Sequence, residues 1–402
     1  MEQIIGDDES NLANREASHV GSLREAIDRS RVFMDGYNPP KFPFSIQSKV
    51  QLVEPSQSVK DLKELCITLG FEGFVVEQPV PWLNSKTNGE VFREMHGRLV
   101  TYLGRLGIEV ILRPTTKNDT FSPRSCDSNK ILLSFHSASG LAPEDDTNLW
   151  RIKESTFPPF FTFDRTGFSG WGELAVNEKL FVDSQKIPID DANDYFSALR
   201  THVTEQGVTK YPQTKCDGEL PGEYVFHAMQ ISNDTVIQLA RITPASLLEQ
   251  LVQLSEKHQK NLLVKRHPMC RNKETLALVQ SLEGHPYTTV IDANIDDLIR
   301  GSESVVVVNS GVGMEALMRS KPVFTTGLSD YKWGTYEVGS DGSSLELAFL
   351  SPRPKLDPIS LAQFVTFYFR DYCMNVFDER SIEEHIAKAL LNWVRLKESS
   401  LL

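Results

Sequence analysis

The chain has 402 residues, of which 40% are hydrophobic and 24% are charged, and its formal net charge is −12 at pH 7. This length predicts about two to three domains, and the composition is that of an ordinary globular protein. The acidic balance argues against nucleic acid or anionic lipid as a partner of the whole surface, and leaves open a local basic pocket.

The N-terminus has no basic stretch followed by an apolar one, so it predicts no secretory signal. No apolar run approaches the length of a membrane-spanning helix. Cysteines are odd in number and form no CxxC pair; they are Cys66, Cys126, Cys216, Cys270 and Cys373. This pattern predicts a soluble protein of the reducing cytoplasm, without a disulfide framework or a zinc site.

In chain order, a polar N-terminal arm ends in the proline-rich stretch 38–43, and strand-like and helix-like segments then alternate. The expected strands are 44–53, 73–80, 108–114 and 130–139, and the expected helices are 58–70 and 88–107. Such alternation predicts a parallel sheet covered by helices. Residues 150–222 are less regular and rich in aromatic residues, glycine and proline, which is typical of a functional segment. Phe157–Phe163 can be core, and Gly167–Trp171 can be a loop that stacks on a sugar.

A second alternating series begins at Tyr224. Its expected strands are 224–231, 261–268, 288–293, 304–310 and 322–327, and its expected helices are 243–260, 272–285, 295–302, 313–320, 358–373 and 381–398. The fold class predicted is α/β, with two Rossmann-like domains at 1–222 and 223–402. The final helices of the second domain are free to pack back on the first.

Three expected strands of the second half end in polar residues, and parallel strands place their carboxyl ends on one rim, where ligands bind. These residues are Gln230, Asn233 and Asp234; Lys265, His267 and Arg271; and Asn309, Ser310, Gly311 and Gly313. The sequence therefore predicts one site that holds an acid, a histidine, cations and a helix N-terminus.

The valine run at Ser304–Val308 has two interpretations. Amides at the start of the following helix can bind a phosphate that glycine allows to approach, or the glycines can serve close packing alone. Asp234 is likewise either the N-cap of a helix or a nucleophile or base. His267 is either a structural hydrogen bonder or, beside Lys265 and Arg271, a group that faces a leaving phosphate. The sequence has no metal-ligand spacing and no GxSxG motif.

Three stretches in this order resemble the capsule-polysaccharide-type retaining β-Kdo glycosyltransferases, which use CMP-Kdo. They are QISND at 230–234, KRHPMCRN at 265–272 and NSGVGMEALMRSKPVFTTG at 309–327, with Tyr331 soon after; GFSGWGEL at 167–174 adds weaker support. The resemblance implies the GT-B arrangement, two Rossmann-like domains facing across a cleft, and a reaction that needs no metal or other cofactor.

The resemblance also implies roles for individual residues. Asp234 matches the nucleophile of the family, His267 and Lys265 would offset charge on departing CMP, and Glu315 would reach the ribose. The other donor-binding candidates are Gln230, Arg271, Asn309, Ser310, Gly311 and Gly313. Glu154 is the first candidate and His136 the second for the base that activates the acceptor. The candidates on the acceptor side are His136, Asp164 and Trp171.

The implied partners are CMP-Kdo and a glycan acceptor in surface-polysaccharide (O-antigen or capsule) synthesis. The acceptor is expected to be lipid-linked, at the cytoplasmic face of the inner membrane, and the chain is expected to touch that membrane only peripherally. A place in a multidomain synthase is compatible with the resemblance. Nucleic acid is not an expected partner. Two alternatives stay open: an inverting transferase that uses CMP-sialic acid, with Asp234 as base, and a non-catalytic CMP- or glycan-binding module.

Overall fold

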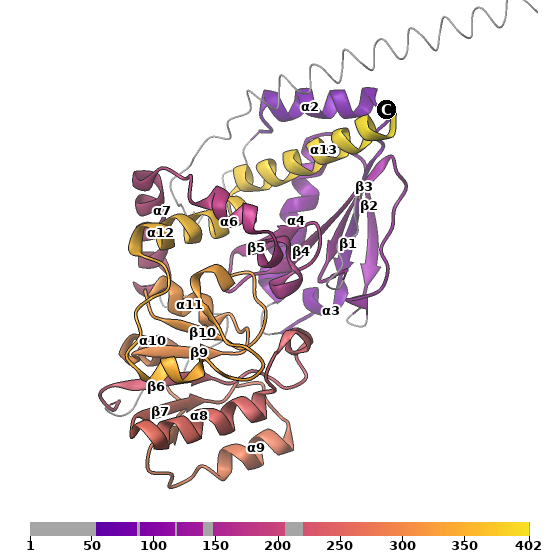
Figure 1. The fold of residues 1–402 in the computed structure, drawn as a ribbon. Coiled ribbons are helices and arrows are strands. Elements are labelled where there is room, and N and C mark those ends of the chain that lie inside the picture. The colour runs from indigo at the N-terminus through magenta and orange to yellow at the C-terminus, as the bar shows by residue number, and fades with distance from the viewer. Residues whose placement is uncertain (1–53, 87–88, 117–118, 140–147, 206–219, 402) are drawn as a thin grey trace, which may run out of the picture.

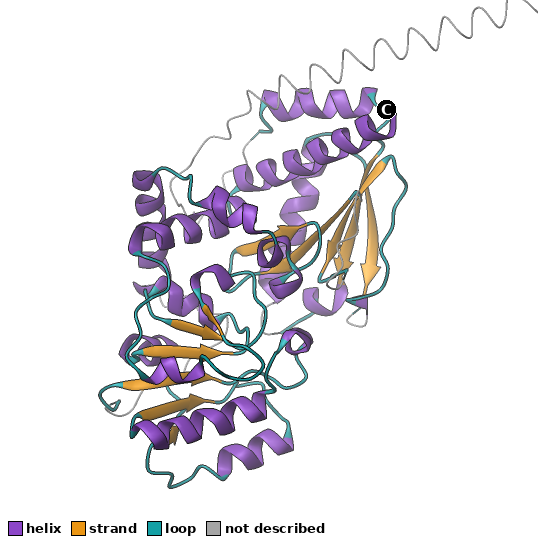
Figure 2. Ribbon diagram, in the orientation of Figure 1, coloured by secondary structure: helices purple, strands orange, loops and turns teal. Residues whose placement is uncertain are grey.

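A computed structural model describes residues 54–86, 89–116, 119–139, 148–205 and 220–401. Two six-stranded sheets lie in different parts of the molecule, each flanked by helices (Figure 1, Figure 2). The predicted α/β class with two Rossmann-like halves is thus confirmed. The predicted N-terminal arm and the strand at 44–53 lie outside the described residues.

The first sheet has the strand order β12-β5-β4-β3-β1-β2. Its strands are β1 (Gly73–Pro79), β2 (Val110–Thr115), β3 (Lys130–Phe135), β4 (Leu149–Glu154), β5 (Phe160–Asp164) and β12 (Cys373–Asn375). β1 to β4 run parallel, whereas β5 is antiparallel to β4 and to β12. The expectation of an irregular segment after Trp150 was therefore wrong. Its aromatic run is part of an antiparallel hairpin. Because both faces of this hairpin are buried, its residues do not alternate between apolar and polar, and the sequence pattern does not reveal the strands.

Side chains alternate across the first sheet, so that its two faces differ. Phe74, Ile131 and Phe161 point to a face covered by three helices, α2 (Gln57–Thr68), α4 (Gly89–Arg105) and α13 (Glu379–Leu401). The opposite face carries the buried polar residues Glu77 and Ser134. One face is thus an apolar core, and the other holds the polar network described below.

The second sheet has the order β11-β10-β9-β6-β7-β8, and all of its strands are parallel. They are β6 (Tyr224–Ala228), β7 (Asn261–Lys265), β8 (Thr288–Val290), β9 (Ser304–Val307), β10 (Val323–Thr325) and β11 (Tyr336–Glu337). The helices of this half are α8 (Pro244–His258), α9 (Lys273–Gln280), α10 (Ile295–Gly301) and α11 (Val312–Met318). α8 packs on one face of the sheet, and α10 and α11 pack on the other. The Thr243 side chain caps α8 by accepting from the Ser246 amide.

The remaining elements are short, except for two longer helices. They are α3 (Val80–Leu83), η2 (Ser169–Trp171), α5 (Glu173–Val176), α6 (Glu178–Ser184), α7 (Ile189–Glu205), η3 (Thr235–Leu239), η4 (Lys332–Gly334), η5 (Leu345–Phe349), α12 (Pro358–Thr366) and the π-helical η6 (Phe367–Tyr372). Phe157 stacks on Phe369 with ring centroids 4.9 Å apart, and Phe160 meets the same ring edge-on. Since both belong to the core of the second half, one apolar core continues across the junction.

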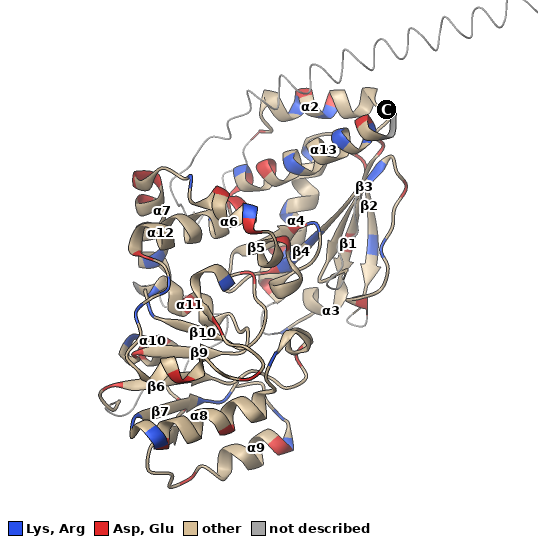
Figure 3. Ribbon diagram, viewed as in Figure 1, with Lys and Arg blue, Asp and Glu red and all other residues tan. Residues whose placement is uncertain are grey.

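The chain returns to the first sheet at its end. β12 pairs with β5, and α13 lies beside α2 (Figure 1). The division at 222 stays a prediction. Basic and acidic residues are interspersed along α13 (Figure 3). Within the described ranges, no helix is long and apolar enough to span a membrane.

Candidate active site

A pocket of about 330 Å³ lies between the carboxyl edges of the two sheets. Trp82, His136 and Glu154 come from the ends of β1, β3 and β4 in the first half. Residues that follow β6, β7, β9 and β10 form the wall of the second half. Both sheets therefore present to the pocket the edge at which open α/β sheets bind ligands.

The wall of the second half contains six of the predicted residues: Gln230, Asp234, His267, Asn309, Ser310 and Gly311. Asp234 is exposed and caps η3, since its carboxylate accepts from the Val236 amide at 3.4 Å. The cap that was one interpretation of Asp234 thus exists, and it leaves this carboxylate on the pocket wall. Nδ1 of His267 accepts from the Met269 amide at 3.1 Å, which fixes the orientation of the ring.

Gln230 and Asn309 are buried and tie the loops of this wall together. Oε1 of Gln230 accepts from the Asn309 amide at 3.3 Å, and Nδ2 of Asn309 donates to the carbonyls of Val236 and Leu328. Oδ1 of Asn309 is buried without a hydrogen-bond partner. A buried acceptor of this kind on a pocket wall is suited to accept a hydrogen bond from a ligand.

The wall of the first half is held in a strained shape at His136, whose φ is 52°. The imidazole stacks on Phe168, with ring centroids 4.9 Å apart, and lies 4.7 Å from the Trp82 ring. Positive φ in a residue other than glycine is maintained only where the surroundings enforce it, and such residues cluster at functional sites. Both candidates for the base, Glu154 and His136, line this wall, and Glu154 is only 7% exposed.

Lys265 and Arg271 do not line the pocket, although the sequence places them beside His267. Nζ of Lys265 is 2.9 Å from the Asp292 carboxylate and donates to the Ala293 carbonyl at 2.6 Å. Arg271 is exposed in the loop before α9. Lys265 is the last residue of β7, and the turn that follows separates its side chain from those of His267 and Arg271.

Gly313 and Glu315 lie behind the pocket in α11. A Cβ on Gly313 would come within 2.6 Å of the Tyr331 ring, so this glycine serves close packing and is not a bare surface for a phosphate. Glu315 is 7% exposed, and its Oε2 has no hydrogen-bond partner. Burial raises the pKa of its carboxyl to about 7. The ribose role of Glu315 stays a prediction.

Asp164 and Trp171, the two other acceptor-side candidates, do not line the pocket. The Asp164 carboxylate accepts from the amides of Thr166, Gly167 and Glu173 and from the Tyr372 hydroxyl. Trp171 is 5% exposed and packs edge-on against Phe168 and Phe121. These residues hold the loop 165–172 in place, and Phe168 and Ser169 of that loop reach the pocket.

The pocket residues that sequence reasoning missed include three with polar side chains: Lys153, Asp330 and Tyr368. Asp330 follows β10, which makes it the fourth strand end on the same rim. The rule that identified the other three strand ends would have found it in the stretch after 322–327. Tyr368 lies inside what the sequence predicted as one continuous helix, and nothing in the sequence pattern separates it from core aromatics.

Among the described residues, no three His, Cys, Asp or Glu side chains are grouped so that they could hold a metal ion. Lys153 and His267 line the pocket, and both side chains can interact with an anionic ligand.

Residues 179–340 match the family model of capsule polysaccharide biosynthesis proteins. The match covers all of the second sheet and the loops that carry Asp234, His267 and Ser310. It confirms, over these residues, the resemblance that the three sequence stretches indicate. A search of curated protein sequences gave no significant match.

Solved structures give distant likenesses. The β-Kdo 2,7 transferase of Thermosulfurimonas dismutans KpsC is 17% identical, with a TM-score of 0.45, over 76% of this chain and 92% of that one. The β-Kdo 2,4 transferase of the same KpsC is 14% identical, with a TM-score of 0.45, over 73% and 89%. The UDP complex of S. aureus MnaA is 12% identical, with a TM-score of 0.31, over 78% and 94%. Because these TM-scores are below 0.5, the fold assignment rests on the sheet topology of this chain.

Proposed function

We propose that this protein is a retaining glycosyltransferase that moves Kdo from CMP-β-Kdo to a glycan acceptor in capsule or O-antigen synthesis. The observation that carries the proposal is the convergence of Asp234, His267 and Ser310 on one pocket wall, opposite Glu154 and His136. The family match covers the first of these walls. We also propose that the acceptor is a lipid-linked glycan, which enters the pocket from the side of the first half.

In the proposed donor complex, the phosphate of CMP lies against Ser310 and Gly311. Gly311 lines the pocket, and its backbone is right-handed helical, so that the start of α11 faces the site. Bare backbone allows an anion to approach closely. The His267 imidazole, oriented by the Met269 amide, stabilises the charge that develops on the leaving phosphate. Lys265 acts through the loop that it anchors, since its ammonium is paired with Asp292.

The proposed reaction has two displacements. A carboxylate oxygen of Asp234 attacks the anomeric carbon of Kdo, the bond from that carbon to the phosphate oxygen breaks, and CMP leaves with the electron pair. An acceptor hydroxyl then attacks the same carbon, the bond to Asp234 breaks, and a base on the protein takes the proton of the hydroxyl. Each step inverts the carbon, so the β configuration is retained. No step requires a metal, since CMP is a good leaving group.

The experiment compares the wild-type chain with Asp234→Asn. Asparagine caps a helix as well as aspartate does, so the variant is expected to fold normally. Loss of the nucleophile is expected to lower Kdo transfer by about 10³-fold or more, the order reached when a covalent catalyst is removed. CMP release and transfer to a panel of glycan acceptors are measured by mass spectrometry, with Asp341→Asn, an exposed turn residue, as the control.

The anomeric configuration of the product, read by NMR, separates the two enzyme mechanisms. A β-linked product from CMP-β-Kdo supports double displacement. An inverted product, or near-normal transfer by Asp234→Asn, contradicts the nucleophilic role of Asp234. Tight binding of CMP without turnover of any CMP-sugar would instead identify a binding module.

A further inference from the structure

A carboxyl group that the proposed mechanism leaves without a role is built into the pocket. Asp330 follows β10 and is 6% exposed, yet it lines the pocket together with Asp234, His267 and Glu154. Asp234 and Asp330 leave the carboxyl edge of one sheet, at β6 and β10, with β9 between these strands. The pocket thus contains a second aspartate of the same sheet, placed to one side of the proposed nucleophile.

The Asp330 carboxyl is held by the Tyr368 hydroxyl, which in turn contacts Ser155. Its Oδ2 accepts from the Tyr368 hydroxyl at 3.0 Å, and that hydroxyl is 3.2 Å from the Ser155 hydroxyl. Because the tyrosine proton is directed to Asp330, Ser155 is the donor in the second bond. Ser155 follows β4 of the first half and lines the pocket as well. The pair thus links the two pocket walls through one tyrosine.

The segment that supplies the tyrosine is η6, a π-helical turn that continues α12. π-Helical turns are rare and are frequently found at functional sites, because they move one residue out of the regular helical spacing. Here the turn places Tyr368 at Asp330 and Tyr372 at Asp164. Both tyrosine hydroxyls are therefore used to hold buried carboxyl groups.

Burial raises the pKa of the Asp330 carboxyl to about 6, against the hydrogen bond from Tyr368, which lowers it. The charge of Asp164 also raises this pKa, and that of Lys153 lowers it. The other titratable groups that interact with Asp330 are Tyr331, Tyr372 and Cys373, whose pKa values are themselves raised, mainly by burial. Near neutral pH the carboxyl can both take up and release a proton, as a general base requires.

Glu154, the other buried carboxyl of the pocket, has a different partner. Its Oε2 lies 4.0 Å from Nζ of Lys153, and the same ammonium donates to the Glu154 carbonyl at 3.3 Å. Glu154 is thus tied to an ammonium group, whereas Asp330 is held by a tyrosine hydroxyl.

We propose that Asp330 is the base that accepts the proton of the acceptor hydroxyl in the second displacement, and that Tyr368 positions it. This inference rests on the proposed function. As the hydroxyl oxygen attacks the anomeric carbon, its proton passes to an Asp330 carboxylate oxygen, and the bond to Asp234 breaks with its electrons returning to Asp234. Asp330 then loses its proton to solvent.

The test uses the full-length chain with CMP-Kdo as donor, and water and azide as nucleophiles. Water needs a base to attack the Asp234 adduct, whereas azide is already an anion and needs none. Asp330→Asn keeps an acceptor for the Tyr368 hydroxyl, so its fold is expected to persist. The variant should release about one equivalent of CMP in a burst, accumulate the adduct seen by intact mass, and turn over about 10²-fold or more slowly in water. Sodium azide should restore turnover and yield a β-glycosyl azide.

Control variants separate the proposed base from its neighbours. Asp341→Asn, the same change at an exposed turn, should behave as wild type. Glu154→Gln should not be rescued by azide, and rescue of Glu154→Gln in place of Asp330→Asn would overturn the inference. Slow turnover of Asp330→Asn that azide does not restore would show a merely structural role and would overturn it too.

The proposed function can fail separately. If the wild-type chain releases no CMP from CMP-Kdo, both proposals are overturned together. If the wild type turns over and Asp330→Asn matches it, only the role of Asp330 is overturned.

The pH profile of azide-free turnover gives a second readout, which a structural role would not produce. A base must be deprotonated to act, so turnover should fall as the pH drops through about 6, where the Asp330 carboxyl gains its proton. Tyr368→Phe removes the hydrogen bond that lowers the pKa of Asp330, so the acidic limb should move to higher pH. An acidic limb that stays in place in Tyr368→Phe would contradict the positioning role of Tyr368.

Discussion

Gly311 and Gly313 stand two residues apart at the start of α11 and do different things. A Cβ on Gly311 would touch Thr156 of the opposite wall at 3.3 Å, whereas one on Gly313 would meet the Tyr331 ring at 2.6 Å. Gly311 has right-handed helical φ and ψ, so a side chain there causes no backbone strain. The valine run therefore leads into one glycine that faces the pocket and another that a tyrosine ring covers.

The matched pair Gly311→Ala and Gly313→Ala tests this division. Gly313→Ala should lower the free energy of unfolding by about 1–3 kcal/mol, because the ring must move to make room. Gly311→Ala should lower it by less than about 1 kcal/mol, with the loss falling on CMP affinity. Urea denaturation and calorimetric titration with CMP measure the two effects. Unchanged CMP binding by Gly311→Ala would contradict the phosphate role of this loop.

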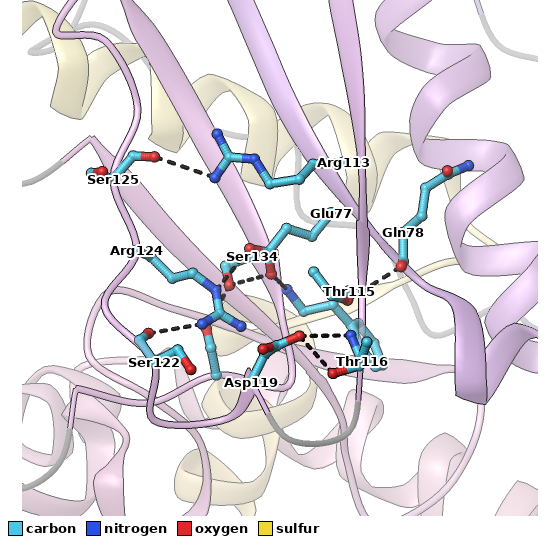
Figure 4. A network of polar contacts seen from close by, with 12 residues as sticks. Glu77, Gln78, Arg113, Thr115, Thr116, Asp119, Ser122, Arg124, Ser125 and Ser134 are labelled. Carbon is cyan, nitrogen blue, oxygen red and sulfur yellow. Dashed lines mark hydrogen bonds and ion pairs between the residues drawn. The ribbon is translucent and has the colours of Figure 1, made fainter.

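At the scale of single elements, the loop between β2 and β3 is fixed by a buried ion pair (Figure 4). Nε of Arg124 donates to the Glu77 carboxylate at 2.8 Å, and the same carboxylate accepts from the Ser134 hydroxyl and the Phe135 amide. Thr120 of this loop contacts Nδ1 of His136 at 3.4 Å. The network thus supports the strained backbone of a pocket residue from behind.

Arg124→Ala should be strongly destabilising, since it leaves a carboxylate buried without its cation. Removing one partner of a buried pair costs about 3–5 kcal/mol, and we expect a loss near the lower figure. Arg113→Ala is the control, because that side chain makes an exposed hydrogen bond to the Ser125 carbonyl and should cost less than about 0.5 kcal/mol. Thermal unfolding monitored by circular dichroism compares the two. Equal melting temperatures would mean that the pair does not hold the loop.

The elements also show what the sequence can and cannot predict. Periodicity located β6 to β10 and α8 to α13, because each of these strands is a short apolar run between a helix and a polar turn, and it missed the short strands β11 and β12. It failed after Trp150, where β4 and β5 pair in an antiparallel hairpin whose two faces are both buried. The rule that ligands bind at the carboxyl ends of parallel strands led to Asp234, His267 and Ser310. Two other candidates, Asp164 and Lys265, do not line the pocket, because the direction of a side chain depends on the turns that follow its strand.

At the scale of the whole molecule, the chain crosses between its halves more than once. Helix α7, which precedes the predicted boundary, packs on α12. Thr366 donates to the Ala192 carbonyl of α7 at 3.1 Å, and the Gln363 side chain donates to the Ile187 carbonyl, just before α7, at 2.7 Å. In the other direction, α13 supplies Trp393, fully buried in the core of the first sheet. Each half therefore packs against a segment that belongs, by residue number, to the other half.

This interleaving predicts how pieces of the chain behave. Residues 223–402 alone would lack α7 and would expose the apolar face of α13, so we expect them to associate and to unfold without cooperativity. Residues 185–372 keep the α7–α12 contacts and omit β12 and α13, so they should give the sharper urea transition of the two. Circular dichroism and sedimentation velocity measure both pieces beside the full chain. A monomeric piece 223–402 with a cooperative transition would mean that α7 and the first sheet are dispensable. The wall that carries Asp234 would then be stable without the first half. The first half would contribute only the other wall of the pocket.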